Sequence, residues 1–383
     1  MQYNDSKFFV YFYISAMKDR DISIDILRGI AIFAMIAANM APYNFAEPHG
    51  FAFRIYGSIA APMFIFLAGM MVSYTATIKA HKLNYYLKRA GATLLVAALI
   101  DSLIWDILPF ITYDVLYMIA LGMPVIFFFN KLPRAAQVIL IVLIFAITPL
   151  LHYYLGYAES PSEVVLSEGN AFTAASEIPV WRQFLHEGWF PLFPWIGVSL
   201  LGAFVGSFKF KTAPEAFHKN LLIAGAALFV TGLVSWLIIL PEVATNEGFD
   251  GSPQSPVFYK FLITREGYSE LFYPPTFFYL FTFLGFILMM LPLMYKIQRN
   301  AVLNLLTVYG RSSLLVYILH TLFIAVIFAN EDSIFGNIGL HDFGGFMLLY
   351  LLHALVLWLI CFGVQKLKKG KQFPFLVNFI LGS

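Results

Sequence analysis

The chain has 383 residues, of which 60% are hydrophobic, 18% aromatic and only 12% charged. About a quarter of the residues in a soluble globular domain are charged, so this composition excludes such a domain and predicts an all-α, polytopic integral membrane helix bundle. The formal net charge of +2 gives no sign of nucleic-acid binding, and we expect none. The single cysteine, Cys361, excludes an internal disulfide bond and a metal site built from cysteines.

Ten apolar segments are long enough to cross a bilayer, which requires about 20 residues for a helix. They are residues 25–45, 57–78, 90–109, 112–130, 135–155, 189–208, 219–240, 273–296, 303–329 and 342–365. No polar domain, linker or internal repeat interrupts them. We therefore predict about ten spans in one transmembrane domain over residues 25–365, with a cytoplasmic segment at 1–24 and a basic cytoplasmic tail at 366–383. The apolar stretch 8–14 is too short to span, and it is expected to be interfacial or disordered.

The lysine and arginine residues indicate how the helices are oriented. Most of them fall in every second loop, beginning with the N-terminal segment and ending with the C-terminal tail. Because cytoplasmic loops are enriched in these residues, both termini are predicted to be inside. The long outer loops, 156–188 and 241–272, carry most of the acidic residues. Two alternatives fit these loops: a solvated cap over the bundle, or a lid that helps to bind a polar acceptor.

The first span and the loop after it carry polar groups where hydrocarbon disfavours them. Asp25 and Arg28 are three residues apart, so they share a helix face, either as an anchoring ion pair or as a site for an anionic ligand. Gly29 lets another helix or a ligand approach closely. Asn39 lies about 20 Å from Asp25 along the helix, in the outer half of the membrane. His49 follows in the outer loop.

The ninth span repeats this layout. Arg311 lies in its inner half and must face water, an acidic partner or an anionic ligand, because it stays charged. His320 lies nine residues further out, roughly 14 Å along a continuous helix. In both spans a basic group lies in the inner half of the membrane and an uncharged polar group lies in the outer half. This shared layout predicts a route through the bundle for a phosphate-bearing ligand.

Other titratable residues have less specific settings. Asp101 and Asp106, at the outer end of the third span, are expected to pair with a histidine or to face water. His353, in the middle of the tenth span, is expected to be a buried, hydrogen-bonded histidine. No zinc-protease, phosphate-loop, dinucleotide-binding or serine-hydrolase motif occurs, and no histidine pair has metal-ligand spacing. No metal is therefore predicted.

Four segments, taken in order, resemble the catalytic core of the heparan-α-glucosaminide N-acetyltransferase family and its bacterial relatives. They are SIDILRGIAIFAMIAANMAP, APMFIFLAGMMVSY after the loop with His49, FPLFPWIGVSLLGAFVG and VYGRSSLLVYILH. The resemblance extends from about residue 20 to 325, and the Pro62, Phe64 and Gly69 positions of the second segment match the family's second helix. It implies transfer of an acetyl group from cytosolic acetyl-CoA to an amino sugar on the far side of the membrane. The catalytic residues it implies are His49, Asn39 and His320, and the residues it implies for the acetyl-CoA site are Asp25, Arg28, Gly29, Arg311 and Ser313.

The sequence therefore predicts a transmembrane N- or O-acetyltransferase with an amine or hydroxyl of a sugar or glycan as acceptor. The alternatives are a transporter of a small polar or anionic solute, and a scaffold or sensor with a degenerate site. We expect a multi-pass protein of the bacterial or archaeal cytoplasmic membrane, in contact with membrane lipid. Gly202 and Gly206 have a spacing that serves internal helix packing or a homodimer.

Overall fold

The structure is a computed structural model that describes residues 21–46, 49–156, 161–209, 214–243, 271–272, 275–297, 300–329, 342–369, 371 and 373–382. The predicted interfacial stretch 8–14 and most of the outer loop 241–272 lie outside the described residues. The described elements are α2 (Ile22–Asn44), α3 (Phe51–Gly57), α4 (Ala60–Thr77), α5 (Leu83–Leu103), α6 (Val115–Phe129), α7 (Arg134–Leu155), α8 (Ala171–Glu177), α9 (Val180–Arg182), the π-helical turn η1 (Gln183–Glu187), α10 (Leu192–Lys209), α11 (Pro214–Val243), α13 (Phe277–Lys296), α14 (Ala301–Arg311), α15 (Ser313–Ile327), α16 (Phe343–Lys368) and α17 (Phe375–Leu381).

The predicted polytopic helix bundle is confirmed, and every predicted span coincides with a helix or a helix pair. Among the described residues, six helices are long and apolar enough to cross a membrane, and two bent helix pairs raise this number to eight. The 15-residue α6 is shorter than a span, and α5 contains Lys88, Arg89 and Asp101. The count of ten spans therefore stays a prediction.

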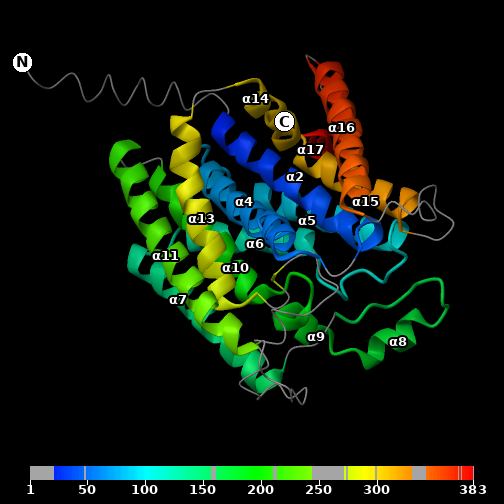
Figure 1. The fold of residues 1–383 in the computed structure, drawn as a ribbon, viewed down its shortest axis with the longest axis horizontal. Coiled ribbons are helices and arrows are strands. Elements are labelled where there is room, and N and C mark those ends of the chain that lie inside the picture. Colours follow the sequence, from blue (N-terminus) through cyan, green and yellow to red (C-terminus); the bar gives the residue numbers. More distant parts are fainter. Residues whose placement is uncertain are drawn as a thin grey trace, which may run out of the picture.

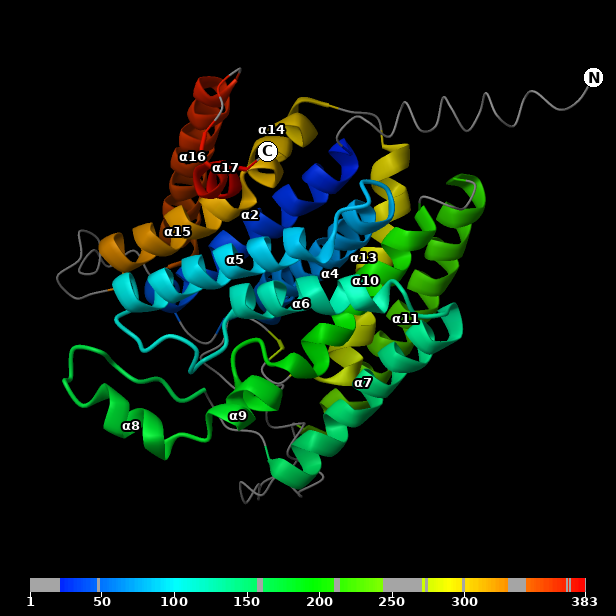
Figure 2. The same ribbon diagram turned by 180° about the vertical axis from the view of Figure 1, so that it is seen from behind.

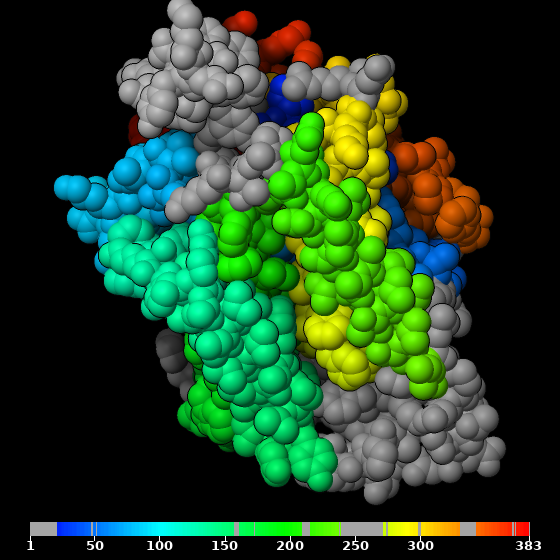
Figure 3. Space-filling view, turned by 90° about the vertical axis from the view of Figure 1, so that its left-hand side faces the viewer, coloured from blue at the N-terminus to red at the C-terminus, as the bar shows by residue number. Residues whose placement is uncertain are grey.

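Helix α2 runs through the middle of the bundle (Figure 1) and packs against α4, α13, α14, α15 and α16. Seen from behind, α5 and α6 lie side by side across α2 and α4 (Figure 2). Helices α7 and α11 form an outer face (Figure 3), and their apolar residues there, such as Val142 and Ile223, are more than half exposed. A helix that turns apolar side chains outward in this way suits contact with lipid.

Helix α2 owes its start to Asp21, whose carboxylate accepts hydrogen bonds from the backbone N–H groups of Ser23 and Ile24 at 3.0 and 3.4 Å. Such a cap satisfies donors that the first turn of a helix leaves unpaired. The helix continues through Pro42 and ends at Asn44. This places Asn39 inside the helix, five residues before its last residue.

Small residues serve packing within the chain. A Cβ atom at Gly202 would lie 2.0 Å from the carbonyl oxygen of Phe66, and one at Gly206 would lie 2.8 Å from that of Met70. These two glycines therefore let α10 touch the backbone of α4. The structure shows Gly202 and Gly206 in helix packing within the chain, one of the two predicted alternatives. The other alternative, a homodimer, stays untested.

The expectation of one continuous ninth span is wrong. The chain breaks at Ser312, where α14 and α15 meet at an angle of 83°. The Gln365 side-chain amide, from α16, donates to the carbonyl oxygen of Val308 at 2.8 Å and to the Ser312 hydroxyl at 2.9 Å. These bonds satisfy backbone and side-chain groups that the break frees, so the bend is stable in a buried setting.

The predicted tail, residues 366–383, is helical over much of its described length. Helix α16 extends to Lys368, and α17 packs against α15. The Lys368 ammonium donates to the carbonyl oxygen of Gly382. The tail thereby lies against the corner between α14 and α15.

Candidate active site

A cavity of about 560 Å³ lies at the end of the bundle where α2 terminates. Its walls come from α2, α4 and α15, from the connection between α5 and α6, and from the segment before α10. By the predicted orientation this is the outer half of the membrane. The volume is in the range of small-molecule binding sites.

Asn39 and His320 meet in this cavity, although they are 281 residues apart. The Asn39 amide nitrogen lies 2.9 Å from Nε2 of His320, and Nδ1 of His320 lies 3.1 Å from the carbonyl oxygen of Val316. A carbonyl only accepts, so Nδ1 carries the hydrogen and Nε2 accepts from Asn39. The ring therefore presents a basic nitrogen next to an amide donor. The break at Ser312 makes this possible, because it turns α15 across the end of α2.

Two carboxylates are held in the cavity wall by tyrosines. The Tyr117 hydroxyl donates to Oδ2 of Asp101 at 2.6 Å, and the Tyr317 hydroxyl donates to Oδ2 of Asp114. The ring of Tyr317 also packs edge-on against His320, with the ring centroids 5.2 Å apart. Asp101 thus pairs with a tyrosine, whereas the sequence suggested a histidine or water. Asp106 lies outside the cavity and accepts from the backbone N–H of Ser167 at 3.3 Å.

The outer segment, residues 161–191, forms part of the cavity wall and contributes Glu163, Trp189 and Phe190. Backbone hydrogen bonds tie it to the connection between α5 and α6. Leu108 donates to Val164 at 2.8 Å, and the N–H groups of Trp189 and Phe190 donate to Thr112 and Tyr113 at 2.9 and 2.7 Å. Of the two alternatives for this loop, a cap and a lid, these contacts favour a wall of the binding site.

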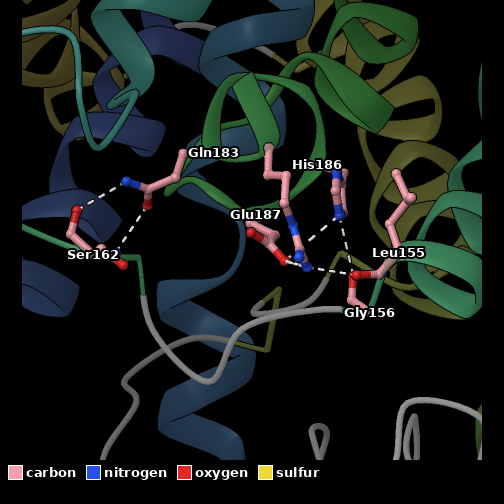
Figure 4. Close-up of polar contacts among 7 residues, drawn as sticks. Leu155, Gly156, Ser162, Gln183, His186 and Glu187 are labelled. Carbon is pink, nitrogen blue, oxygen red and sulfur yellow. Dashed lines mark hydrogen bonds and ion pairs between the residues drawn. The ribbon is translucent and has the colours of Figure 1, made fainter. Parts of the chain in front are cut away.

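Side chains of α9 and η1 connect the two ends of the outer segment and tie it to the end of α7 (Figure 4). The Gln183 amide donates to the carbonyl oxygen of Ser162 at 3.0 Å and accepts from its N–H at 2.8 Å. Arg182 donates to Glu187, and Nε2 of the buried His186 lies 3.1 Å from the carbonyl oxygen of Gly156. Glu163 follows Ser162 directly, so Gln183 holds the backbone next to a cavity carboxylate.

His186 makes the stability of the folded protein sensitive to acid. Burial of the ring, together with the positive charge of Arg182, lowers the pKa of His186 from 6.5 to about 4. The unfolded chain therefore binds a proton at a higher pH than the folded chain does, and stability present above pH 6.5 is lost as the pH falls towards 4. We expect the Tm of the purified protein to drop by about 3 °C over this window through His186. The measurement is a thermal melt at several pH values, in which His186→Asn should show a smaller drop. Equal slopes for both proteins would contradict the assignment.

His49 does not line the cavity. It is 6% exposed and stacks on Phe45, with Phe53 on another side. Its Nε2 atom lies 3.3 Å from the carbonyl oxygen of Phe45, and its buried Nδ1 atom has no hydrogen-bond partner among the described residues. The structure therefore does not bring His49 together with Asn39 and His320, and its catalytic role stays a prediction.

His353 only partly matches its expectation. It is buried, but neither ring nitrogen makes a hydrogen bond to a residue that the structure describes. The ring stacks instead on Phe328, with centroids 6.0 Å apart. The physical reason is that its neighbours on this side of α16 are aromatic rings.

The residues expected to bind acetyl-CoA lie at the opposite, inner end of α2. Asp25 is buried, and its Oδ2 atom lies 3.6 Å from Nε of Arg311, whose side chain is 41% exposed. Gly29 packs on α14, where a Cβ atom would lie 2.2 Å from the carbonyl oxygen of Leu306. Arg28 and Ser313 are half-buried. At this level α2 and α14 are in backbone contact, so the expected route between them is closed.

Four residues that line the cavity or hold its carboxylates were not predicted from the sequence. Tyr117, Tyr317, Asp114 and Glu163 were not singled out. Asp114 had a detectable signal, because it directly precedes an apolar run and caps α6 through a bond from the N–H of Val115 at 2.6 Å. The two tyrosines had none, since aromatic residues are common in all spans. Among the described residues, no three His, Cys, Asp or Glu side chains form a group that could hold a metal ion.

The fold and the cavity define a multi-pass membrane protein with polar groups in a cavity at one end of its helix bundle. The family model for "Heparan-alpha-glucosaminide N-acetyltransferase, catalytic" matches residues 20–241, which is more than half of the chain. The chain therefore belongs to this family of membrane acetyltransferases, as the sequence resemblance indicated. No curated protein matches it. The matched range contains Asn39, His49 and the carboxylates of the cavity, whereas His320 and Arg311 lie beyond it.

Proposed function

We propose that the protein transfers an acetyl group from cytosolic acetyl-CoA to an amine or hydroxyl group of a sugar or glycan on the outer side of the membrane. The observation that carries this proposal is the Asn39–His320 pair, which presents a basic nitrogen and an amide donor in a cavity at the outer end of the bundle. Membership of the acetyltransferase family supports the reaction class. We further propose that the membrane is the cytoplasmic membrane of a bacterium or archaeon.

In this mechanism Nε2 of His320 acts as the general base. It takes the proton of the acceptor amine or hydroxyl while that atom attacks the thioester carbonyl. The carbon–sulfur bond then breaks, and the proton returns to the departing CoA thiolate. Nε2 has a single lone pair, so the Asn39 amide must leave it before His320 accepts the proton, and the amide hydrogens can then stabilise the oxyanion.

We assign the CoA phosphates to the inner end of α2. Arg311 and Arg28 supply positive charge there, and Asp25 lies beside Arg311. Gly29 is on α2 with Arg28, and Ser313 is the first residue of α15. Arginine binds phosphate oxygens through paired hydrogen bonds. Because α2 and α14 are in contact at this level, the thioester arm would reach the cavity along another side of α2.

Radiolabelled acetyl transfer in membrane vesicles tests the proposal. Vesicles containing the wild-type protein should transfer label from acetyl-CoA to an added amino sugar, whereas Asn39→Ala vesicles should not. His49→Ala separates two assignments, because the geometry favours His320 as the base and the family resemblance favours His49. Wild-type rates for both Asn39→Ala and His320→Ala would contradict the mechanism.

A transporter remains the second candidate, because the span made by α14 and α15 is broken, with a bend of 83°. Discontinuous helices with exposed backbone groups form substrate sites in many transporters. Acetyl-CoA should raise the melting temperature of the purified acetyltransferase. A transporter for another solute should melt at the same temperature with and without it.

A further inference from the structure

We propose that helix α17 is an autoinhibitory segment, which covers the inner arginines in this structure and must move away before the phosphates of acetyl-CoA bind. This inference rests on the proposed function, because it concerns access to the CoA site of the same protein. It gives a role to a C-terminal helix that the acetyl-transfer step itself does not use.

Helix α17 packs against α15, at the corner where α15 meets α14 (Figure 2). A Cβ atom at Gly382 would lie 2.0 Å from the carbonyl oxygen of Arg311 and 3.3 Å from the Cα atom of Ser312. Gly382 has a φ of 79°, a backbone conformation that glycine adopts without strain. The end of α17 is therefore in close backbone contact with the residue that carries the inner guanidinium group.

Helix α17 also contacts a second arginine. The guanidinium carbon of Arg89, from α5, lies 4.7 Å from the centroid of the Phe379 ring. Guanidinium groups stack on aromatic rings in this way and also bind phosphate oxygens. Helix α17 thus connects Arg89 of α5 to Arg311 at the corner and fills the space between them. A phosphate group that contacts both arginines needs this space.

The two helices that α17 connects also line the outer cavity. Helix α5 contributes Asp101 to the cavity wall, and α15 contributes Tyr317 and His320. Because α2 and α14 are in backbone contact, we place the thioester arm of acetyl-CoA along α5 and α15. Helix α17 then lies at the inner end of the path that leads to His320.

The contacts of α17 are few enough to open. None of its seven residues is fully buried, and Phe375, Leu376 and Val377 are exposed. Ile380 packs against the hydrophobic core, and the Lys368 ammonium donates to the carbonyl oxygen of Gly382. A helix of this length is not stable by itself. Segments with few buried contacts are also those that open at the lowest free energy.

A docked α17 weakens the binding of acetyl-CoA in a predictable way. The apparent Kd is the intrinsic Kd divided by the fraction of molecules in which α17 is released. Bound phosphates in turn keep α17 released, because the two cannot occupy the same space. Weakening the contacts of α17 should therefore strengthen the binding of CoA, whereas loss of a helix that belongs to the binding site would weaken it.

Calorimetric titration of CoA into the full-length protein in nanodiscs tests the proposal. Phe379→Ala should lower the Kd about threefold, the size of one exposed cation–π contact. Gly382→Ala should also lower it, because the added Cβ atom has no room beside Arg311. Leu376→Ala is the matched control, because Leu376 is on the same helix but is 39% exposed and lies outside the core. Its Kd should equal that of the wild type.

Deletion of residues 374–383 removes the whole helix. If α17 is released in one molecule of ten, the Kd for CoA should fall about tenfold. A thermal melt shows whether this protein folds, and the two point variants test the proposal if it does not. S-acetylcysteamine, a thioester donor without phosphates, should be used equally well by the wild type and by every variant, because α17 covers only the phosphate site.

Hydrogen exchange supplies a readout that does not depend on affinity. Saturating CoA should speed exchange of the backbone amides of residues 375–382 in the wild-type protein, because the helix leaves its docking site. Amides of α3, at the opposite end of α2, should exchange at the same rate with and without CoA. This comparison distinguishes release of α17 from a general loosening of the bundle.

The outcomes separate the two proposals. An unchanged or raised Kd in both Phe379→Ala and Gly382→Ala overturns the autoinhibition while leaving acetyl transfer intact. Exchange of residues 375–382 that CoA slows or leaves unchanged also overturns it. Absence of CoA binding to the wild type and to every variant overturns the proposed donor, and this inference with it.

Discussion

His320→Ala is expected to lower kcat for acetyl transfer by about 10³-fold, a typical contribution of a general base. The variant removes the basic Nε2 atom and leaves the Asn39 amide without the acceptor that orients it at 2.9 Å. KM for acetyl-CoA should change little, because Arg28 and Arg311, the residues that we propose to bind the CoA phosphates, lie at the other end of α2. The measurement is a steady-state assay with purified protein, with acetyl-CoA and acceptor varied separately.

His353→Phe is the matched control for this prediction. It also removes a buried histidine from the same half of the chain, but that ring packs on Phe328 and its nitrogens make no hydrogen bond within the described structure. We expect kcat of this variant to stay within about twofold of wild type. A comparable loss in both variants would show that His320 acts through folding and not through chemistry.

Gly310→Ala is expected to destabilise the bundle by about 3 kcal/mol, at the upper end of overpacking effects. A Cβ atom at this position would lie 1.9 Å from the carbonyl oxygen of Asp25, and neither backbone can yield without separating α14 from α2. The same displacement should disturb the Asp25–Arg311 pair. Thermal unfolding in detergent, together with the fraction of folded protein on size-exclusion chromatography, measures the effect.

Gly363→Ala provides the comparison for this second prediction. Gly363 is also a helical glycine, but nothing lies within 4 Å of the position that its Cβ atom would take. Because alanine favours helix over glycine, this variant should be as stable as wild type or slightly more stable. If Gly310→Ala melts at the same temperature as Gly363→Ala, the close contact between α2 and α14 is wrong.

The positions of the helices could be predicted because each depends on local composition. Long apolar runs need only their own length and the bilayer thickness to define a span, so predicted segments such as 135–155 agree with α7 (Arg134–Leu155). The break at Ser312 could not be predicted in this way. It depends on Gln365, which is 53 residues away and supplies hydrogen bonds only when α16 packs against the corner.

The site was predictable in part. Asn39, His320, Asp25 and Arg311 stood out because polar groups in apolar runs are rare. The partners of these side chains could not be predicted, because the contacts between side chains of different helices depend on how the helices cross. Asn39 contacts His320 and Asp25 lies beside Arg311, and each of these contacts spans more than 250 residues. In the sequence, Glu163 is one of many carboxylates in the outer loops. Only the folded outer segment places it at the cavity.

The sequence by itself determined that this protein is a helical membrane protein and which family it belongs to, because hydropathy and ordered motifs are properties of the chain alone. Only the tertiary structure decided which polar groups share a cavity. It joined Asn39 to His320, placed three carboxylates around them and left His49 among aromatic rings. The physical reason is that side-chain contacts between helices depend on crossing angles and breaks, and these are set by packing of the whole bundle.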